Sequence, residues 1–278
     1  MNCNLYLRPP VHRRFLPRVR NAGGANGRSD GWSRQGNTAG GNRDLQGAAI
    51  RSKGSCFSAE SSVSIHFIEP LEQLHRRCLN MAALVQGAVE QITQALHSRR
   101  PELAREVMDN EQQIDAQEVE IELAAINLLA KHQPDPTDLR TVFAIVKINS
   151  DLERIGDCAF NIAQMVGTIA DVAGAIPEDL KTMAEAATRQ VHDTTRCLGT
   201  YDSDLAGAVC QGDDVIDALY HQIYQDLQTA MIADTTRVPV NLAMIMAAKN
   251  YERIADHCTN IAEEVVYLVR GQMIRHVH

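Results

Sequence analysis

Two short stretches of this sequence place carboxylates where they could hold a cation. Residues 152–157 are Leu-Glu-Arg-Ile-Gly-Asp, and residues 251–256, ninety-nine positions later, are Tyr-Glu-Arg-Ile-Ala-Asp. Each stretch sets a Glu four residues before an Asp, and each continues to Asn-Ile-Ala, at 161–163 and 260–262. Residues four apart in a helix lie within about 40° of each other, so each Glu and Asp share one face. The chain therefore carries one arrangement of oxygen ligands twice.

The repeated carboxylates are expected on the outer face of their helices. Around Ile254, the apolar residues of the last helix form one stripe that predicts its core-facing side, and Ile155 holds the same place in the earlier copy. Opposite this stripe lie the three oxygen-bearing residues of each copy, which are Glu153, Asp157 and Asn161 in the first and Glu252, Asp256 and Asn260 in the second.

The helix before each motif helix adds further acidic residues along one flank. The matching positions are Glu111, Asp115, Glu118 and Glu122 in the first half and Asp213, Asp217, Tyr220 and Tyr224 in the second. If antiparallel packing brings these flanks beside the motifs, each half presents four or more carboxylates on one patch. Clustered carboxylate and amide oxygens suit hard cations or iron. A merely solvated face is the alternative, although such a face would more naturally alternate Glu with Lys.

Other candidate residues give weaker signals. His257 and His221 each lie near a motif carboxylate and are accessory ligand candidates. Residues 72–75, Glu-Gln-Leu-His, match a ferritin-type ExxH, but a di-iron carboxylate enzyme needs that motif on two helices with inward-facing ligands. A di-iron carboxylate oxidoreductase is therefore the alternative function. The sequence has no Gly-rich phosphate loop and no GxSxG nucleophile motif, so we expect a protein that is not an enzyme.

The elements that must position these residues are helices. From about residue 65 the apolar pattern is helical almost throughout, and prolines mark most of the joins. The pattern predicts an all-α fold of six long helices, at roughly 69–98, 101–131, 137–173, 177–200, 203–233 and 239–270. Because the second half repeats the first, we expect two tandem, sequence-related three-helix bundles, at 65–173 and 177–276.

Charge divides the chain into two regions. Residues 1–57 hold ten Arg and Lys against two Asp, which leaves 17 basic and 33 acidic residues for 58–278. The acidic body argues against nucleic acid as a partner. Residues 1–58, rich in Gly, Asn, Arg and Ser, are expected to be a disordered basic extension. A start site assigned too far upstream, an organelle transit peptide and a functional basic tail all remain open as explanations.

The cysteines and the hydropathy pattern bear on location. The seven Cys are scattered and form no CxxC pair, which is typical of a reducing compartment, so we expect a cytoplasmic protein. No apolar run reaches the ~18–20 residues that a membrane helix needs. A membrane contact is therefore expected only through partners.

At these residues the sequence resembles the PhoU family, the phosphate transport system regulatory proteins of bacteria. The resemblance rests on Glu-Gln-Gln-Ile-Asp at 111–115, on the segment from Asp138 to Asp157, on the second motif with Asn260-Ile261, and on Gly-Gln-Met-Ile-Arg-His at 271–276. It covers about 65–276, whereas residues 1–58 have no counterpart in the family.

The resemblance implies a fold, a site and a biological role. It implies paired three-helix bundles with surface multinuclear metal clusters held by E(D)xxxD motifs, whose ligands here would be Glu153, Asp157, Glu252 and Asp256, with Asp115 and Asp217 beside them. All-oxygen ligands admit iron, which we place first, and also manganese, magnesium, calcium or zinc. The role implied is that of an adaptor, expected as a homodimer. It would repress phosphate-starvation signalling by contacting the phosphate ABC transporter ATPase and a membrane sensor histidine kinase. A third hypothesis, a purely structural helical module, would bind no metal.

Overall fold

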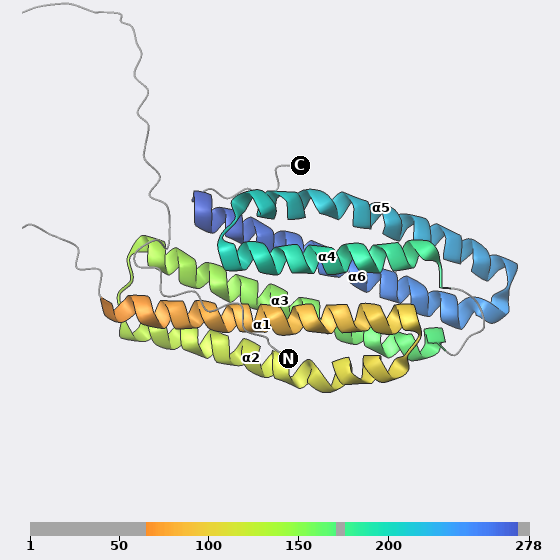
Figure 1. Ribbon diagram of the computed structural model, residues 1–278, viewed down its shortest axis with the longest axis horizontal. Coiled ribbons are helices and arrows are strands. Elements are labelled where there is room, and N and C mark those ends of the chain that lie inside the picture. Colours follow the sequence, from red (N-terminus) through yellow and green to blue (C-terminus); the bar gives the residue numbers. More distant parts are fainter. Residues whose placement is uncertain (1–64, 171–175, 272–278) are drawn as a thin grey trace, which may run out of the picture. The chain divides into compact units, whose positions relative to one another are not determined.

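Six long helices make up most of the chain that the computed structural model describes, which is residues 65–170 and 176–271 (Figure 1). They are α1 (Ile65–Ser98), α2 (Pro101–Lys131), α3 (Pro136–Ala170), α4 (Glu178–Thr200), α5 (Ser203–Ala233) and α6 (Val238–Arg270), with a short 3-10 helix, η1 (Thr235–Arg237), before α6. These ranges contain no β-strand, so the predicted all-α fold of six long helices is confirmed. The expected extension at 1–58 and the repeat ends at 171–173 and 272–276 lie outside the described residues.

The helix starts follow the local sequence. Pro101 and Pro136 begin α2 and α3, where a first-turn residue needs no backbone N–H partner. The Asp202 carboxylate caps α5 by accepting hydrogen bonds from two backbone N–H groups, each at 3.0 Å. Pro70, expected in a first turn, instead lies inside α1, because the helix extends back to Ile65. Burial of Phe67, whose ring packs edge-on against that of His132, offsets the backbone hydrogen bond that Pro70 cannot donate.

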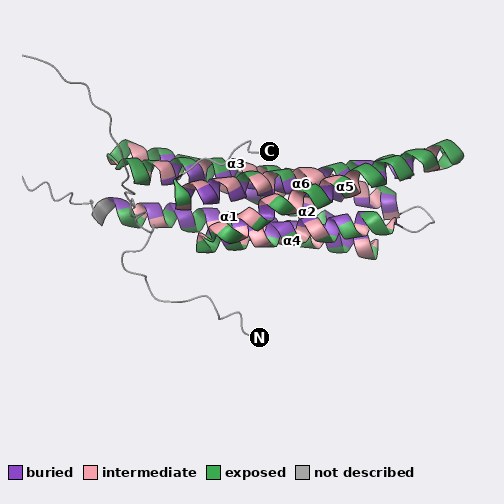
Figure 2. Cartoon of the chain, turned by 90° about the horizontal axis from the view of Figure 1, so that it is seen from above, coloured by how far each residue is buried: buried purple, intermediate pink, exposed green. Residues whose placement is uncertain are grey.

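Each half of the helical region is a three-helix group in which every helix contacts the other two. The groups are α1–α2–α3 and α4–α5–α6, and they meet through α3 against α6 and α1 against α4 (Figure 1). The contact between α3 and α6 is the most extensive of all. Buried residues of all six helices belong to one hydrophobic core, and the buried stripes face inward along each helix (Figure 2). The division into two domains therefore stays a prediction.

The two motif helices run antiparallel and meet at their motifs. Lys147 of α3 pairs with Glu264 of α6 at 3.2 Å, and Asp151 pairs with His257 at 3.0 Å, so rising numbers on α3 meet falling numbers on α6. The polar bridge from Asp151 lies close to both motifs in sequence. The central contact of the fold thus holds the two copies of the motif in a fixed relation.

A pair of glycine substitutions tests the packing behind the first motif. A Cβ on Gly156 would lie 3.2 Å from two side-chain carbons of Ile114, whereas a Cβ on Gly87 would have no neighbour within 4 Å. We expect Gly156→Ala to lower the free energy of unfolding by about 1 kcal/mol through overpacking, and Gly87→Ala to raise it by about 0.5–1 kcal/mol through helix propensity. Urea unfolding of both variants checks this. A rise for Gly156→Ala equal to that for Gly87→Ala would show that Ile114 yields without cost.

Candidate metal centre

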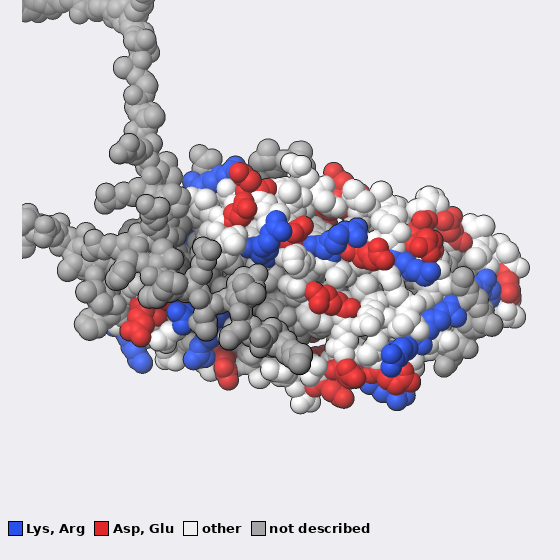
Figure 3. Space-filling model, in the orientation of Figure 1, with Lys and Arg blue, Asp and Glu red and all other residues white. Residues whose placement is uncertain are grey.

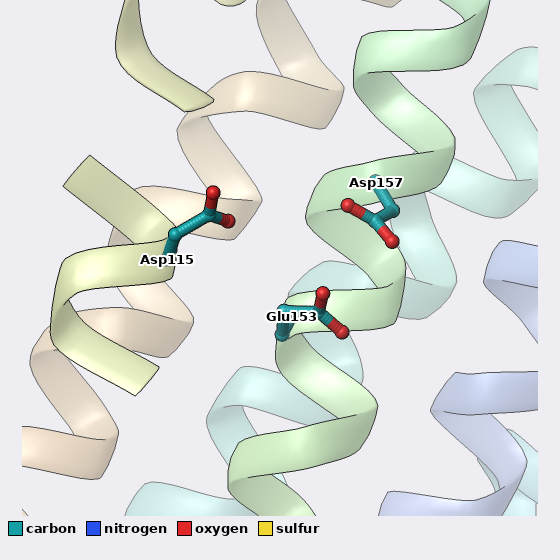
Figure 4. A group of neighbouring side chains, drawn as sticks. All are labelled: Asp115, Glu153 and Asp157. Atoms are coloured by element: carbon teal, nitrogen blue, oxygen red, sulfur yellow. The ribbon is translucent and has the colours of Figure 1, made fainter. Parts of the chain in front are cut away.

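Three carboxylates gather where α2 meets α3. One oxygen of Asp115, one of Glu153 and one of Asp157 all lie within 4.8 Å of one another. Figure 4 shows Asp115 pointing from α2 toward α3, where Glu153 and Asp157 stand one turn apart on the same side of the helix. We call these three residues the first acidic site. Among the residues that the structure describes, this is the one group of His, Cys, Asp and Glu side chains that meets such a spacing.

Two contacts between α2 and α3 position the first acidic site. The side-chain amide of buried Asn149 donates a hydrogen bond to the backbone carbonyl of Glu118 at 3.0 Å. This bond sets the position of α3 along the axis of α2. Gly156, between the two motif carboxylates, lets Ile114 approach α3 closely. The neighbouring Asp115 is thereby carried to the edge of α3, where it meets the motif.

The carboxylates of this site repel one another. Burial, and then the charge of Asp157, raise the pKa of Glu153 above its ordinary value. Burial followed by neighbouring carboxylates also raises the pKa of Glu111 and of Glu118. Arg154 offsets part of this charge, with its Nε 3.5 Å from Oε2 of Glu153. Several negative charges remain close together, an arrangement that a bound cation would relieve.

The matching residues of α5 and α6 form a second acidic site, which we define as Asp213, Asp217, Glu252 and Asp256. Burial, then the charges of Asp256, Asp217 and Glu252, raise the pKa of Asp213 to about 6. Burial, then Glu252 and Asp217, also raise the pKa of Asp256. These effects indicate that the four carboxylates lie near one another, although among the described residues they do not gather three oxygens as closely as the first acidic site does. The packing of α5 against α6 has therefore brought together the second set of predicted residues.

A basic residue beside the second acidic site, Lys249, was not anticipated from the sequence. The Lys249 ammonium contacts both carboxylate oxygens of Glu252 at 2.5 Å and lies 5.2 Å from the centre of the Tyr220 ring. The signal was present, because Lys249 precedes Glu252 by three residues and so shares its face. Glu252 is also less exposed than an outer face implies, at 13% for its side chain, and Lys249 lies against both of its oxygens.

The predicted amide and histidine ligands occupy other places. Asn260 donates a hydrogen bond to Oδ1 of Asp151 at 3.3 Å, and His257 lies 3.0 Å from the same oxygen, so both face the contact between α3 and α6. Asn161 is half-buried on α3, and His221 is exposed on α5. The role of Asn161 and of Asn260 as ligands stays a prediction.

The residues present fit a hard cation. Their donors are carboxylate oxygens, which magnesium, calcium, manganese and iron accept. Oδ1 of Asp213 is buried and has no hydrogen-bond partner, so it is an oxygen whose desolvation nothing in the described residues offsets. A cation held by Asp115, Glu153 and Asp157, or by the second acidic site, would supply the missing positive charge.

The ferritin-type candidate on α1 does not form such a site. His75 is buried and its ring stacks on that of Tyr201, with 5.1 Å between ring centres. Burial lowers its pKa below the ordinary value. No buried group of metal-ligating side chains includes it within the described ranges, 65–170 and 176–271. The structure therefore offers no support for a di-iron centre in the core.

Figure 3 shows one face of the molecule, on which acidic and basic side chains are interspersed. Exposed pairs such as Arg77 with Glu120, at 3.6 Å, and Arg189 with Glu185, at 3.9 Å, have this character. Such pairs are worth at most about 1 kcal/mol each. The two acidic sites differ from them because several carboxylates converge there on few basic groups.

The raised carboxylate pKa values predict a pH dependence of stability. An unfolded Asp has a pKa of about 3.9, so between about pH 4 and 6 folded Asp213 keeps a proton that the unfolded chain has lost. The contribution of Asp213 to the free energy of unfolding therefore falls as pH rises through this window. We expect Asp213→Asn to flatten the decline, measured by urea unfolding at pH 4.5 and 6.5 with chelator present. Exposed Asp226→Asn is the control, and a decline in Asp213→Asn as steep as in the wild type would contradict the assignment.

Fold and sites together define an internally duplicated, all-α six-helix protein with an acidic surface site in each half. The family profile described as "PhoU domain" matches residues 78–166 and again residues 180–265, one segment in each half. The chain belongs to the PhoU family, as the sequence motifs predicted.

Known relatives agree with this assignment over most of the chain. A protein of Aquifex aeolicus named phosphate-specific transport system accessory protein PhoU homolog is 38% identical over 209 residues, which are 75% of this chain and 95% of the relative. The phosphate-specific transport system accessory protein PhoU of Escherichia coli is 30% identical over 216 residues, 77% of this chain and 90% of the relative. These relatives are named as accessory proteins of transport.

Two solved structures share the fold. The crystal structure of PhoU from Pseudomonas aeruginosa has a TM-score of 0.72 and 32% identity, covering 74% of this chain and 100% of that chain. The phosphate transport system regulatory protein PhoU of Streptococcus pneumoniae has a TM-score of 0.69 and 27% identity, covering 75% of this chain and 99% of that chain. The all-α, six-helix arrangement is thus shared with PhoU proteins.

Proposed function

We propose that this protein is a metal-binding regulatory adaptor of phosphate uptake that is not an enzyme. It represses phosphate-starvation signalling by contacting the ATPase of the phosphate ABC transporter and a membrane sensor histidine kinase. Membership of the PhoU family and the names of the relatives, accessory or regulatory proteins of phosphate transport, support the regulatory part. The first acidic site, with three carboxylates within 4.8 Å, is the observation that carries the metal-binding part.

The surface supports a role in protein contacts. Large apolar side chains are exposed on both sides of the turn between α2 and α3, namely Leu123, Ile126, Leu139 and Phe143. At positions matched by the ninety-nine-residue offset, Val238 and Leu242 are also exposed on α6. Groups of exposed apolar residues are typical of surfaces that bind other proteins. None of the helices within 65–170 and 176–271 combines the length and the apolar character that a membrane span requires. We propose that the protein meets the membrane only through its partners.

In this adaptor the cation shapes the surface rather than performing a reaction. A bound cation would neutralise Asp115, Glu153 and Asp157, and so hold α2 against α3 at the edge of the molecule. It would supply positive charge to which an acidic or phosphate group of a partner could bind. Asp115, Glu153 and Asp157 would hold the cation, and the packing of Asn149 and Gly156 keeps these three residues in place.

Gene deletion tests the regulatory function. Removal of this gene is expected to switch on phosphate-starvation genes in phosphate-rich medium, and return of the full chain is expected to silence them. Transcript levels of those genes in the two strains give the result. Genes that stay silent in the deletion strain at high phosphate would contradict the proposed repression.

The alternative oxidoreductase is separated by a direct assay. The adaptor is expected to show no turnover when ferrous ions and oxygen are added, because its ligands are a surface group and His75 is buried against Tyr201. Oxygen consumption by the full chain loaded with ferrous iron measures this. Catalytic consumption beyond one oxidation per bound iron would support the oxidoreductase instead.

A further inference from the structure

The two acidic sites, although they arise from one duplicated motif, differ in the basic group that pairs with the motif glutamate. Arg154 lies 3.5 Å from one oxygen of Glu153, whereas Lys249 lies 2.5 Å from both oxygens of Glu252. We infer that Lys249 is a counter-ion built into the second acidic site, so that the first site takes a divalent cation readily and the second only when Lys249 is displaced. This inference rests on the proposed metal binding and adds an order of filling to it. It concerns how this chain responds to rising cation concentration.

The Lys249 ammonium is in close contact with the second acidic site. Its ammonium lies 2.5 Å from both oxygens of Glu252, whose side chain is only 13% exposed. The Tyr220 ring, 5.2 Å away, covers a further side of the ammonium. With one predicted ligand thus engaged, the second acidic site does not gather three carboxylate oxygens within the spacing that the first achieves, among the residues described. Lys249 therefore supplies, at Glu252, the positive charge that a bound cation would otherwise supply.

The first repeat differs at both of these positions. By the ninety-nine-residue offset Ser150 stands where Lys249 stands, and by the offset of 102 between α2 and α5 Glu118 stands where Tyr220 stands. The first site therefore lacks the lysine and has a carboxylate where the second has the ring that covers it. Both differences make the second acidic site less negative than the first. The first keeps only the more distant and exposed Arg154 as a counter-charge, and the second is neutralised more closely by Lys249.

The lysine is held in a way that permits its displacement. Its side chain is 46% exposed, so the ammonium can move into water when a cation binds. Asp213, which presents a buried oxygen without a hydrogen-bond partner, then completes a set of carboxylates with Glu252 and Asp256. A divalent ion replaces one positive charge by two, but it must first compete with a tethered ammonium. Competition lowers the apparent affinity of the second site without removing its ligands.

The first measurement is isothermal titration of Mn²⁺ into the full chain after chelator treatment. The wild type is expected to show two classes of site separated by about fivefold in Kd, the upper end of what one ion pair with a half-exposed partner contributes. Glu153→Gln is expected to remove the tight class and Glu252→Gln the weak class. These variants assign each class to its site. A wild type in which both sites bind Mn²⁺ with one Kd would overturn the inference.

Matched exchanges of the lysine then test its role. Lys249→Met keeps the aliphatic stem against Tyr220 but removes the charge, and it is expected to tighten the weak class by about fivefold. Ser150→Lys places an ammonium at the exposed matched position and is expected to weaken the tight class by a similar factor. Circular dichroism melting confirms that each variant is folded. A Lys249→Met protein whose weak class is unchanged would overturn the inference while leaving metal binding intact.

The proposed function fails by a different result. If no variant, nor the wild type, binds Mn²⁺, Mg²⁺ or Fe²⁺, then metal binding itself is wrong, and the role of Lys249 falls with it. If the wild type binds at both sites but neither lysine exchange alters the affinities, only the order of filling is wrong.

Discussion

Replacing Glu153 and Asp157 together by Gln and Asn is expected to abolish cation binding at the first acidic site. Both residues supply oxygens to the group that includes Asp115, so the double variant leaves one charged ligand of three. We expect Kd for Mn²⁺ at this site to rise by at least ~100-fold, and the stabilisation by saturating Mn²⁺, about 2.7 kcal/mol at one hundred times Kd, to disappear for this site. Isothermal titration and urea unfolding with and without Mn²⁺ measure the two effects.

The same variant has the opposite effect on the metal-free protein. Burial, and then the charge of Asp157, raise the pKa of Glu153, so removal of both charges is expected to stabilise the chelator-treated chain by a few tenths of a kcal/mol. The matched control is Glu102→Gln with Glu106→Gln, an exposed pair with the same four-residue spacing on α2. The control is expected to leave Mn²⁺ binding unchanged. Equal loss of binding in both double variants would indicate a general effect of charge rather than a site.

Replacing Tyr251 by Ala is expected to cause the largest loss of stability. Tyr251 is among the largest fully buried side chains, and its hydroxyl lies 3.1 Å from that of Thr93, which lies 2.9 Å from that of Thr188. This chain of hydroxyls joins α6 to α1 and α4, and so joins the two halves. A cavity of this size is expected to lower the free energy of unfolding by about 3–5 kcal/mol, measured by urea unfolding.

Two further variants separate the contributions of Tyr251. Tyr251→Phe removes only the hydroxyl and is expected to cost about 1 kcal/mol, because Thr93 keeps its contact with Thr188. Tyr224→Ala, at an exposed tyrosine of α5, is expected to cost less than about 1 kcal/mol. A loss for Tyr251→Ala no greater than that for Tyr224→Ala would show that the core tolerates the cavity, against the packing described.

Much of this fold could be predicted from the sequence because its helices are long and strongly patterned. The apolar stripe around Ile155 and Ile254 is buried as expected, and the prolines at 101 and 136 begin their helices. The helix start predicted from Pro70 was wrong, because a proline marks a helix start only where no residue before it can pack against the core. Here Phe67 is buried and extends α1 beyond it. Such a contact between distant segments leaves no local signal.

The candidate site was predicted in part. Helical spacing placed Glu153 beside Asp157, and the flank of α2 brought Asp115 to them. Spacing within one helix could not show that Asn260 turns toward Asp151, because that contact depends on the register between α3 and α6. Lys249 could have been found, since it lies three residues before Glu252 on the same helix. Comparison of the two repeats position by position would have shown the difference in charge.

The central claim is that the duplicated motifs form cation sites, and the metal content of the native protein tests it most directly. The full chain is to be purified without affinity tag or chelator and analysed by inductively coupled plasma mass spectrometry, beside the variant that carries Glu153→Gln and Asp157→Asn. We expect at least about one equivalent of iron or another hard cation per wild-type chain and a clear loss in the variant. Metal content in the wild type no higher than in the variant would contradict the account.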